Sequence, residues 1–349
     1  MSTNRIPVGA RPEVRIDGSD VGRRVSVRRV EADPDPATGR PAFRDAIGVL
    51  TSWDGHELTV LTRDLTEVRI ARDALVAGKT VPLFPARAAA VPEVDPVALQ
   101  RIAARGWPAV EQEQLGEWTL RAAAGFTRRA NSVQALGDPG LPLDRALDRV
   151  RQWYAGRGLP AFVEVIEPGS PAELTAVLDR LGAAYAPTLV RTAPLTALTR
   201  APGVTEASVS RVRLSRRADD AWMSVYHRVG EAPAAEAAAA LVLHGGPSVW
   251  FAAVPAPDGS APLAIGRCVV DGPWACLGAI EVRPAARRQG LASALMAVLA
   301  ARAAEEGAQA AYLQVEAEND GALALYDRLG FTTSHTYHYA RLPQPEPAA

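Results

Sequence analysis

The stretch of sequence that decides the fold is Glu281-Val282-Arg283-Pro284-Ala285-Ala286-Arg287-Arg288-Gln289-Gly290-Leu291-Ala292. It predicts a strand that ends at Pro284, a basic turn, and a helix that begins near Gly290 and continues to about Glu306. The first turn of a helix has unpaired backbone N–H groups and about half a positive charge. Arg287 and Arg288 add full charges at the same end. The stretch therefore predicts a site for a phosphate or pyrophosphate.

The spacing of this turn separates it from two other phosphate-binding loops. It is shorter than the phosphate loop of nucleotide hydrolases and lacks that loop's Gly-Lys-Ser/Thr ending, and the dinucleotide fingerprint G-x-G-x-x-G is missing as well. The pattern Arg287-x-x-Gly290-x-Ala292 after a Val-x-Pro strand end resembles motif A of the GCN5-related N-acetyltransferases (GNAT).

A second motif lies downstream, after a strand-like run at residues 310–315. Motif B of the same family is a strand, an Asn, a short helix that carries a Tyr, and then Gly-Phe. The segment 318–331 matches it at Asn319, Ala322, Tyr326, Gly330 and Phe331. Because the two motifs occur at ordinary spacing, the resemblance to the family implies an N-acetyltransferase that uses acetyl-CoA as cosubstrate.

Length and composition limit the number of domains and the classes of partner. The chain has 349 residues, of which 48% are hydrophobic, so two or three domains with real cores are expected. A formal net charge of −1 points to neither nucleic acid nor a membrane surface. Cys268 and Cys276 are too few for a disulfide framework and are expected to be small buried residues. Since the sequence shows no signal-peptide core and no long apolar run, we expect a soluble cytoplasmic protein.

Residues 13–86 are expected to form a small closed β-barrel. Short runs with period two recur there, and Asp54-Gly55 is a strong hairpin signal between two of them. A further turn is expected at Ala77-Gly78-Lys79, before Val81-Pro82. The pattern resembles SH3- and Tudor-like modules. Aromatic residues are too few for a recognition cage, so a docking role with a protein partner is favoured for this barrel. Nucleic acid is disfavoured, because the charge is near neutral and aromatic and basic residues do not alternate.

Three segments are expected to lie outside the folded domains. Residues 1–12 and 343–349 lack an apolar pattern and are expected to be disordered tails. Residues 87–98 lie in a stretch rich in Ala and Pro and are expected to be a linker.

An internal repeat divides the remainder of the chain. Sliding the sequence against itself by 148 residues places 177–182 on 325–330. The simplest interpretation is a tandem of acetyltransferase-like halves, with a degenerate half at 99–200 and a catalytic half at 206–342. The first half lacks the tyrosine, and an acidic turn at 137–142 replaces the basic loop. We therefore expect no acyl-CoA there and a structural role as a wall of the substrate site.

Hydrophobic periodicity predicts the elements of both halves. Strands are expected at 115–123, 129–136, 161–166, 209–214, 249–254, 263–270 and 275–282, and helices at 143–157, 171–181, 219–228 and 233–243. The expected fold is thus an α/β (α+β) GNAT fold with a mixed, mostly antiparallel sheet. It is duplicated, and a small SH3/Tudor-like β-barrel precedes it.

The resemblance implies how acetyl-CoA would be held. Backbone N–H groups of the loop and of the first helical turn, together with the two arginines, would bind the pyrophosphate, and the pantetheine arm would run along the preceding strand. An asparagine in motif B would bond the pantetheine amides. The expected cofactor-binding residues are Ile280, Val282, Arg287, Arg288, Gln289, Gly290, Leu291, Ala292, Ser293, Asn319 and Tyr326. No metal is expected.

The expected catalytic residues are Tyr326 and Glu281. Tyr326 matches the family residue that protonates the departing thiolate as general acid. Without the resemblance it would be interpreted as a core aromatic on an amphipathic helix. Glu281 ends the strand beside the site and is the candidate general base, although strand alternation could turn it away. Glu316, Glu318 or a water chain are the alternatives.

The sequence says less about the amine that accepts the acetyl group than about its donor, acetyl-CoA. The order of barrel, degenerate half and active half resembles actinobacterial acetyltransferases of the N-acetylglutamate synthase-like and histone acetyltransferase-like group. Arg213, Arg216, Arg217 and Arg267 lie in segments that could line the cleft, which favours a small acceptor with a carboxylate, such as glutamate. The alternatives are a lysine of a protein substrate, or a non-catalytic protein that senses acyl-CoA.

Overall fold

The computed structural model describes residues 13–31, 34, 38–39, 41–62, 66–81, 90–181, 184–227 and 233–343. The chain forms two compact units, residues 1–85 and 86–349. The expected tails lie outside the described residues, apart from Pro343. The expected linker is shorter than predicted, because a helix already begins at Pro96.

The first unit is an antiparallel sheet around a small core. After a short turn η1 (Gly18–Asp20), its strands are β1 (Arg24–Val30), β2 (Phe43–Trp53), β3 (Glu57–Thr62), β4 (Glu67–Ala71) and β5 (Leu75–Thr80). The order β4-β3-β2-β1-β5 leaves β4 and β5 as edges. The buried core consists of Ile16, Val25, Val27, Ala46, Leu50, Leu58, Val60 and Ile70. The likeness to an SH3 or Tudor module stays a prediction.

Two turns predicted in this unit have different outcomes. The hairpin at Asp54-Gly55 is confirmed: it joins β2 and β3, and the Asp54 carboxylate accepts hydrogen bonds from two backbone N–H groups that follow it. The turn expected at Ala77-Gly78-Lys79 is wrong, because these residues belong to β5, which pairs with β1. Gly78 permits close packing instead, since a Cβ there would lie 2.7 Å from Ile16.

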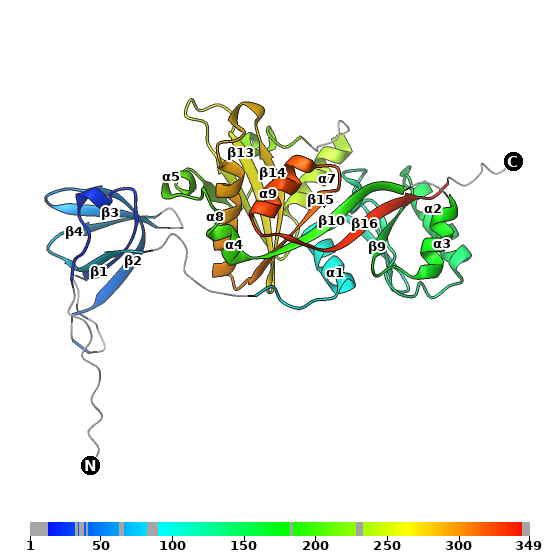
Figure 1. Ribbon diagram of the computed structural model, residues 1–349, viewed down its shortest axis with the longest axis horizontal. Coiled ribbons are helices and arrows are strands. Elements are labelled where there is room, and N and C mark those ends of the chain that lie inside the picture. Colours follow the sequence, from blue (N-terminus) through cyan, green and yellow to red (C-terminus); the bar gives the residue numbers. More distant parts are fainter. Residues whose placement is uncertain are drawn as a thin grey trace, which may run out of the picture. The chain divides into compact units, whose positions relative to one another are not determined.

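The second unit is built on one large sheet with helices on both faces (Figure 1). Its first half contains α1 (Pro96–Gly106), β6 (Glu111–Leu115), β7 (Trp118–Ala122), η2 (Arg128–Ala130), β8 (Val133–Gln134), α2 (Leu143–Ala155), β9 (Phe162–Glu167), α3 (Ala172–Leu181) and β10 (Ala184–Pro194). Its second half contains α4 (Leu195–Thr199), α5 (Glu206–Val209), β11 (Arg213–Ser215), α6 (Asp220–Met223), α7 (Pro233–His244), β12 (Ser248–Val254), β13 (Ala264–Asp271), β14 (Trp274–Val282), η3 (Pro284–Ala286), α8 (Leu291–Glu305), β15 (Ala310–Glu316), α9 (Asp320–Arg328) and β16 (Thr332–Arg341).

Several predicted elements ahead of the catalytic motifs differ from the structure. The expected strand at 209–214 is the end of α5 and the short β11, and the expected helix at 219–228 is the single turn α6. The expected strand at 129–136 consists of the end of η2, the two-residue strand β8 and loop residues. The Asn131 side chain bonds the backbone at four points there, at 2.8 to 3.0 Å. Such local side chain–backbone bonds compete with regular secondary structure.

The elements recur with the offset seen in the sequence. Helices α2 and α8 begin at Leu143 and Leu291, and strands β10 and β16 begin at Ala184 and Thr332, so each pair is 148 residues apart. Strands β9 and β15 and helices α3 and α9 follow the same offset. The boundaries of the two halves stay predictions.

The last strands of the two halves are exchanged. The sheet order is β11-β12-β13-β14-β15-β10-β16-β9-β8-β7-β6, so β10 pairs with β15 and β16 pairs with β9. The two exchanged strands pair with each other, antiparallel, as the adjacent green and red strands of Figure 1. Arg191 on β10 donates to Asp327 Oδ1 of α9 at 2.6 Å. Each half therefore completes the sheet of the other.

Two cores lie on opposite faces of the sheet where β12, β13, β14 and β15 run side by side. One lies under α8 and contains Leu295 and Leu299, and we call its side of the sheet the α8 face. The other contains Trp107, Trp222 and Tyr312 together with residues of α7, and we call its side the α7 face. No helix in the described parts of the chain is long and apolar enough to cross a membrane.

Both cysteines are buried, as predicted. Cys268 packs on the α8 face and Cys276 on the α7 face, and burial raises the pKa of each thiol. A raised pKa keeps a thiol protonated and unreactive at neutral pH.

A buried ion pair stands in the first half. Arg121 Nη2 donates to Glu164 Oε2 at 2.9 Å, and neither residue is more than 2% exposed. Gln100 and Gln134 each donate to the other carboxylate oxygen, at 3.0 and 3.1 Å. Burial raises the pKa of Glu164, but Arg121 and the two amides outweigh it, so the pKa is lowered and the pair is ionised. His335 Nε2 lies 3.1 Å from Gln100 Oε1, and burial lowers the pKa of that imidazole to about 4.

Candidate active site

Strands β14 and β15 separate beside the predicted phosphate loop. They pair only from Trp274↔Ala310 to Cys276↔Tyr312. Beyond that point β14 continues to Val282 along β13, and β15 continues to Glu316 along β10. No strand in the described chain pairs with the β15-facing edge of residues 277–282. The free backbone of that edge can bond an extended ligand as an added strand would.

A bulge in β14 decides which side chains face the opening. The register with β13 shifts between Ile265 and Arg267, opposite Ala279, which has a φ of +50°. As a result Ala279 packs on the α7 face and Ile280 on the α8 face. Glu281 follows the alternation to the α7 face, where its carboxylate oxygens lie 3.4 Å from the His227 backbone N–H. The carboxylate therefore faces the side of the sheet that carries α6 and α7.

The predicted loop is exposed and its backbone is open to a ligand. Arg287, Arg288, Gln289 and Gly290 are exposed, and Arg287 Nε donates to Val282 O at 3.3 Å. Arg288 and Gly290 have φ values of +63° and +75°. No side chain caps the first turn of α8, so its N–H groups are available to an anion. The Leu291 side chain is 2% exposed and anchors the helix, which leaves only its backbone for binding.

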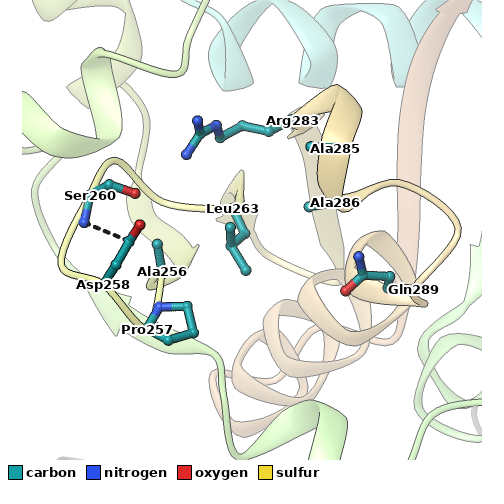
Figure 2. Close-up of a pocket in the computed structure, with 9 residues that line it drawn as sticks. All are labelled: Ala256, Pro257, Asp258, Ser260, Leu263, Arg283, Ala285, Ala286 and Gln289. Carbon is teal, nitrogen blue, oxygen red and sulfur yellow. Dashed lines mark hydrogen bonds between the residues drawn. The ribbon is translucent and has the colours of Figure 1, made fainter.

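A hollow of about 410 Å³ lies on the other side of this loop. Figure 2 shows Ala286 and Gln289 on the loop and Asp258 and Ser260 on the connection between β12 and β13. The Arg283 guanidinium already donates to Ala261 O at 3.1 Å. This hollow is on the β13 side of β14, whereas the free edge of β14 faces β15. The loop is thus reached from two sides.

Motif B lies on the α8 face of the opening. The Asn319 side chain caps α9 by accepting from the Ala322 N–H at 3.1 Å, which leaves its NH₂ group to donate. Tyr326 is partly buried and packs against the same core as Ile280 and Val282. The structure therefore brings Tyr326 to the face opposite Glu281.

The corresponding turn of the first half is closed by its own acidic groups. The Asp138 carboxylate accepts from the Gly140 N–H at 2.8 Å, and the Glu117 carboxylate accepts from the Asp138 N–H at 2.7 Å. In this half the strand before the turn, β8, is paired with the parallel strand β9 over its whole length of two residues. A turn that binds its own carboxylates is a poor site for a pyrophosphate.

The prediction that four arginines lie in segments lining the cleft is wrong. Arg267 is 1% exposed and donates to four backbone carbonyls, so it holds α1 and α7 on the sheet. Arg216 stacks 3.7 Å above the Trp250 ring and pairs with Glu306 at 3.3 Å. Arg213 lies on the edge strand β11, three strands from β14, and Arg217 follows that strand. These segments pack to places that their sequence positions do not reveal.

The sequence missed a polar group that the first half contributes to the α7 face. Arg129 donates to Tyr337 Oη at 3.3 Å, and Tyr337 donates to Gln314 Oε1 on β15 at 2.7 Å. The three residues come from η2, β16 and β15. No spacing signal links them, because the exchanged strand brings them together.

Comparisons with known proteins agree with this fold. The family model described as the C-terminal domain of the probable histone acetyltransferase Rv0428c matches residues 96–340, and a domain of unknown function (DUF6725) matches residues 19–86. The probable histone acetyltransferase Rv0428c of Mycobacterium tuberculosis is 29% identical over 330 residues, which span 91% of this chain and 94% of that protein.

Two further matches, one curated protein and one solved structure, each cover about seven-tenths of this chain. The uncharacterized N-acetyltransferase YobR of Bacillus subtilis is 28% identical over 247 residues, 69% of this chain and 96% of that protein. A GCN5-related N-acetyltransferase from Kribbella flavida shares the fold with a TM-score of 0.54 and 18% identity, covering 72% of this chain and 96% of its own.

Fold and comparisons together define an acetyltransferase of the GNAT class, as predicted. More particularly, the chain belongs to the family of the Rv0428c C-terminal domain, whose model matches well over half of it. The residues assigned to acetyl-CoA and to catalysis stay predictions.

The loop assignment predicts a selective loss of donor binding. Replacing Arg287 with Gln, or Gly290 with Ala, should raise the KM for acetyl-CoA about tenfold, because a charge or a left-handed backbone position is lost. Steady-state kinetics with acetyl-CoA varied would measure this. Arg328→Gln, at an exposed position at the end of α9, is the matched control. Unaltered KM values in both loop variants would remove the assignment.

Proposed function

We propose that the chain transfers the acetyl group of acetyl-CoA to the primary amine of a small amino-acid-type acceptor such as glutamate. The observation that carries the proposal is the separation of β14 from β15 beside the uncapped first turn of α8. An extended arm and a pyrophosphate fit that pair of features.

On the donor side, Arg287, Arg288 and the backbone from Gln289 to Ser293 would hold the pyrophosphate. The backbone at Ile280 and Val282 would hold the pantetheine arm, with Asn319 donating to an amide. A backbone N–H on the free edge of β14 would stabilise the developing oxyanion of the thioester. The Leu291 and Ala292 side chains would take no part beyond packing.

In the reaction, the amine nitrogen bonds to the carbonyl carbon while the carbon–sulfur bond breaks. Tyr326 would give its proton to the departing thiolate from the α8 face. Glu281 would take the proton of the amine on the α7 face, directly or through a water. Because the two groups lie on opposite faces of the sheet, the phenol would not pass its proton directly to the carboxylate.

A lysine side chain of a protein is the second candidate acceptor. The name of the relative from M. tuberculosis, a probable histone acetyltransferase, favours it. The first unit could then dock the protein substrate.

Release of free CoA by the purified full chain would test the proposal. Acceptors would include glutamate, other amino acids, polyamines, aminoglycosides and a lysine peptide. We expect turnover with at least one small amino acid. Turnover with the peptide alone would favour the second candidate, and no turnover with any amine would leave an acyl-CoA-sensing protein as the better description.

A further inference from the structure

Arg129 is a cation inside the molecule that has a phenol as its hydrogen-bond partner. Its side chain is partly buried, and Nε and Nη2 both lie 3.3 Å from Tyr337 Oη. Its Cζ lies 5.8 Å from the centre of the Trp107 ring. Within the described parts of the chain no carboxylate pairs with it. A guanidinium has more N–H donors than one phenol oxygen satisfies.

Other buried arginines of this chain show what a satisfied guanidinium looks like. Arg121 pairs with Glu164 and also donates to the carbonyl and the hydroxyl oxygen of Ser132. Arg267 lacks a carboxylate partner but donates to four backbone carbonyls. Removing a charge from water is unfavourable unless a partner replaces the water. The Arg129 guanidinium therefore has capacity left for an anion.

Arg129 lies on the α7 face, the side of the sheet on which the acceptor amine is expected to bind. Its partner Tyr337 donates to Gln314, which stands two residues beyond Tyr312, the last β15 residue paired with β14. Both Tyr337 and Cys276, at the point of separation on β14, pack on the α7 face. Glu281 faces the same side of the sheet. A molecule that enters from the α7 face would meet Arg129 beside the opening.

The loop that carries Arg129 is held in a strained conformation. Thr127 and Ala124 have φ values of +57° and +48°, which side-chain-bearing residues rarely adopt. The Asn131 side chain and the bond from Trp107 Nε1 to Thr127 Oγ1, at 3.0 Å, hold the loop in place. Strained conformations of this kind persist only where surrounding contacts hold the backbone in place, and they are concentrated at functional sites.

We propose that Arg129, supplied by the degenerate first half, binds the carboxylate of the acceptor and sets the preference for amines that carry one. A carboxylate accepts two parallel hydrogen bonds from a guanidinium, which orients the acceptor as well as attracting it. The inference rests on the proposed function and names the substrate class of that site. It also gives the first half a role in specificity.

Kinetics with matched acceptors test this assignment. For the best amino-acid acceptor, Arg129→Gln should raise the acceptor KM at least about 30-fold, as expected when one partner of a buried charge pair is removed. The same variant should leave kcat/KM unchanged for that amino acid's carboxamide analogues and should leave the acetyl-CoA KM unchanged. Arg129→Lys should restore part of the loss. Arg128→Gln, an exposed neighbour on η2, is the matched control.

Calorimetric titration with acetyl-CoA shows that each variant is folded and keeps its donor site. Should Arg129→Gln fail that check, Tyr337→Phe serves in its place, with a smaller rise in acceptor KM expected. Equal kcat/KM of the wild type for acid and amide, or an Arg129→Gln variant with unaltered acceptor KM, would overturn the inference while the acetyltransferase proposal stands. No CoA release with any amine would overturn the proposed function, and the inference with it.

Discussion

Replacing Tyr326 with Phe is expected to lower kcat by roughly 10²-fold or more, with little change in the KM for acetyl-CoA. The ring packs edge-on against Phe331, with centroids 5.7 Å apart, and Phe keeps that contact. Only the hydroxyl is lost, and with it the proposed proton for the departing thiolate. The variant should therefore fold as the wild type does and fail in the chemical step.

Single-turnover measurements would separate this effect from product release. The single-turnover rate of the variant should fall by the same factor as kcat, because the loss lies in the chemical step. Tyr185→Phe, at an exposed ring on β10, controls for the loss of a hydroxyl elsewhere. A variant with wild-type kcat would return Tyr326 to the role of a core aromatic.

Replacing Glu164 with Ala is expected to lower the free energy of unfolding by about 3–5 kcal/mol, because it leaves Arg121 buried without its counter-ion. For a unit of this size the midpoint of thermal unfolding should fall on the order of 10 °C. The pKa of Glu164 is lowered in the folded state, so the pair stabilises above the ordinary carboxyl pKa. That stabilisation is lost as pH falls through the lowered value.

The double variant Arg121→Leu/Glu164→Leu is the informative control. Apolar replacement of both partners is often neutral or stabilising, so it should recover most of the loss. With the offset of 148 residues, the same positions in the second half are Val269 and Tyr312, so this fold accepts uncharged residues there. Differential scanning calorimetry would measure all three proteins. A Glu164→Ala variant that melts with the wild type would contradict the argument.

Local pattern was enough to predict the elements around the catalytic motifs. Helix α8 and strand β15 lie within a residue or two of their expected bounds, and helix α9 lies between Asn319 and Gly330 as motif B implies. The class of the enzyme followed from the same residues. Prediction failed where one polar side chain organises a loop, as Asn131 does around 123–131, because such bonds leave no periodic signal.

The amino-acid sequence was sufficient for the enzyme class, the repeat and the strand, turn and helix at residues 281–305, because each depends on residues that are near neighbours in the chain. Folding in three dimensions settled the exchange of β10 and β16, the turn of Glu281 to the α7 face, and the joining of Arg129 to Tyr337. Those outcomes depend on strand order, on a bulge at Ala279 and on contacts some 200 residues apart. Period and spacing carry no record of which distant strands will pair, so the proposed donor loop could be predicted from the sequence and the proposed acceptor side could not.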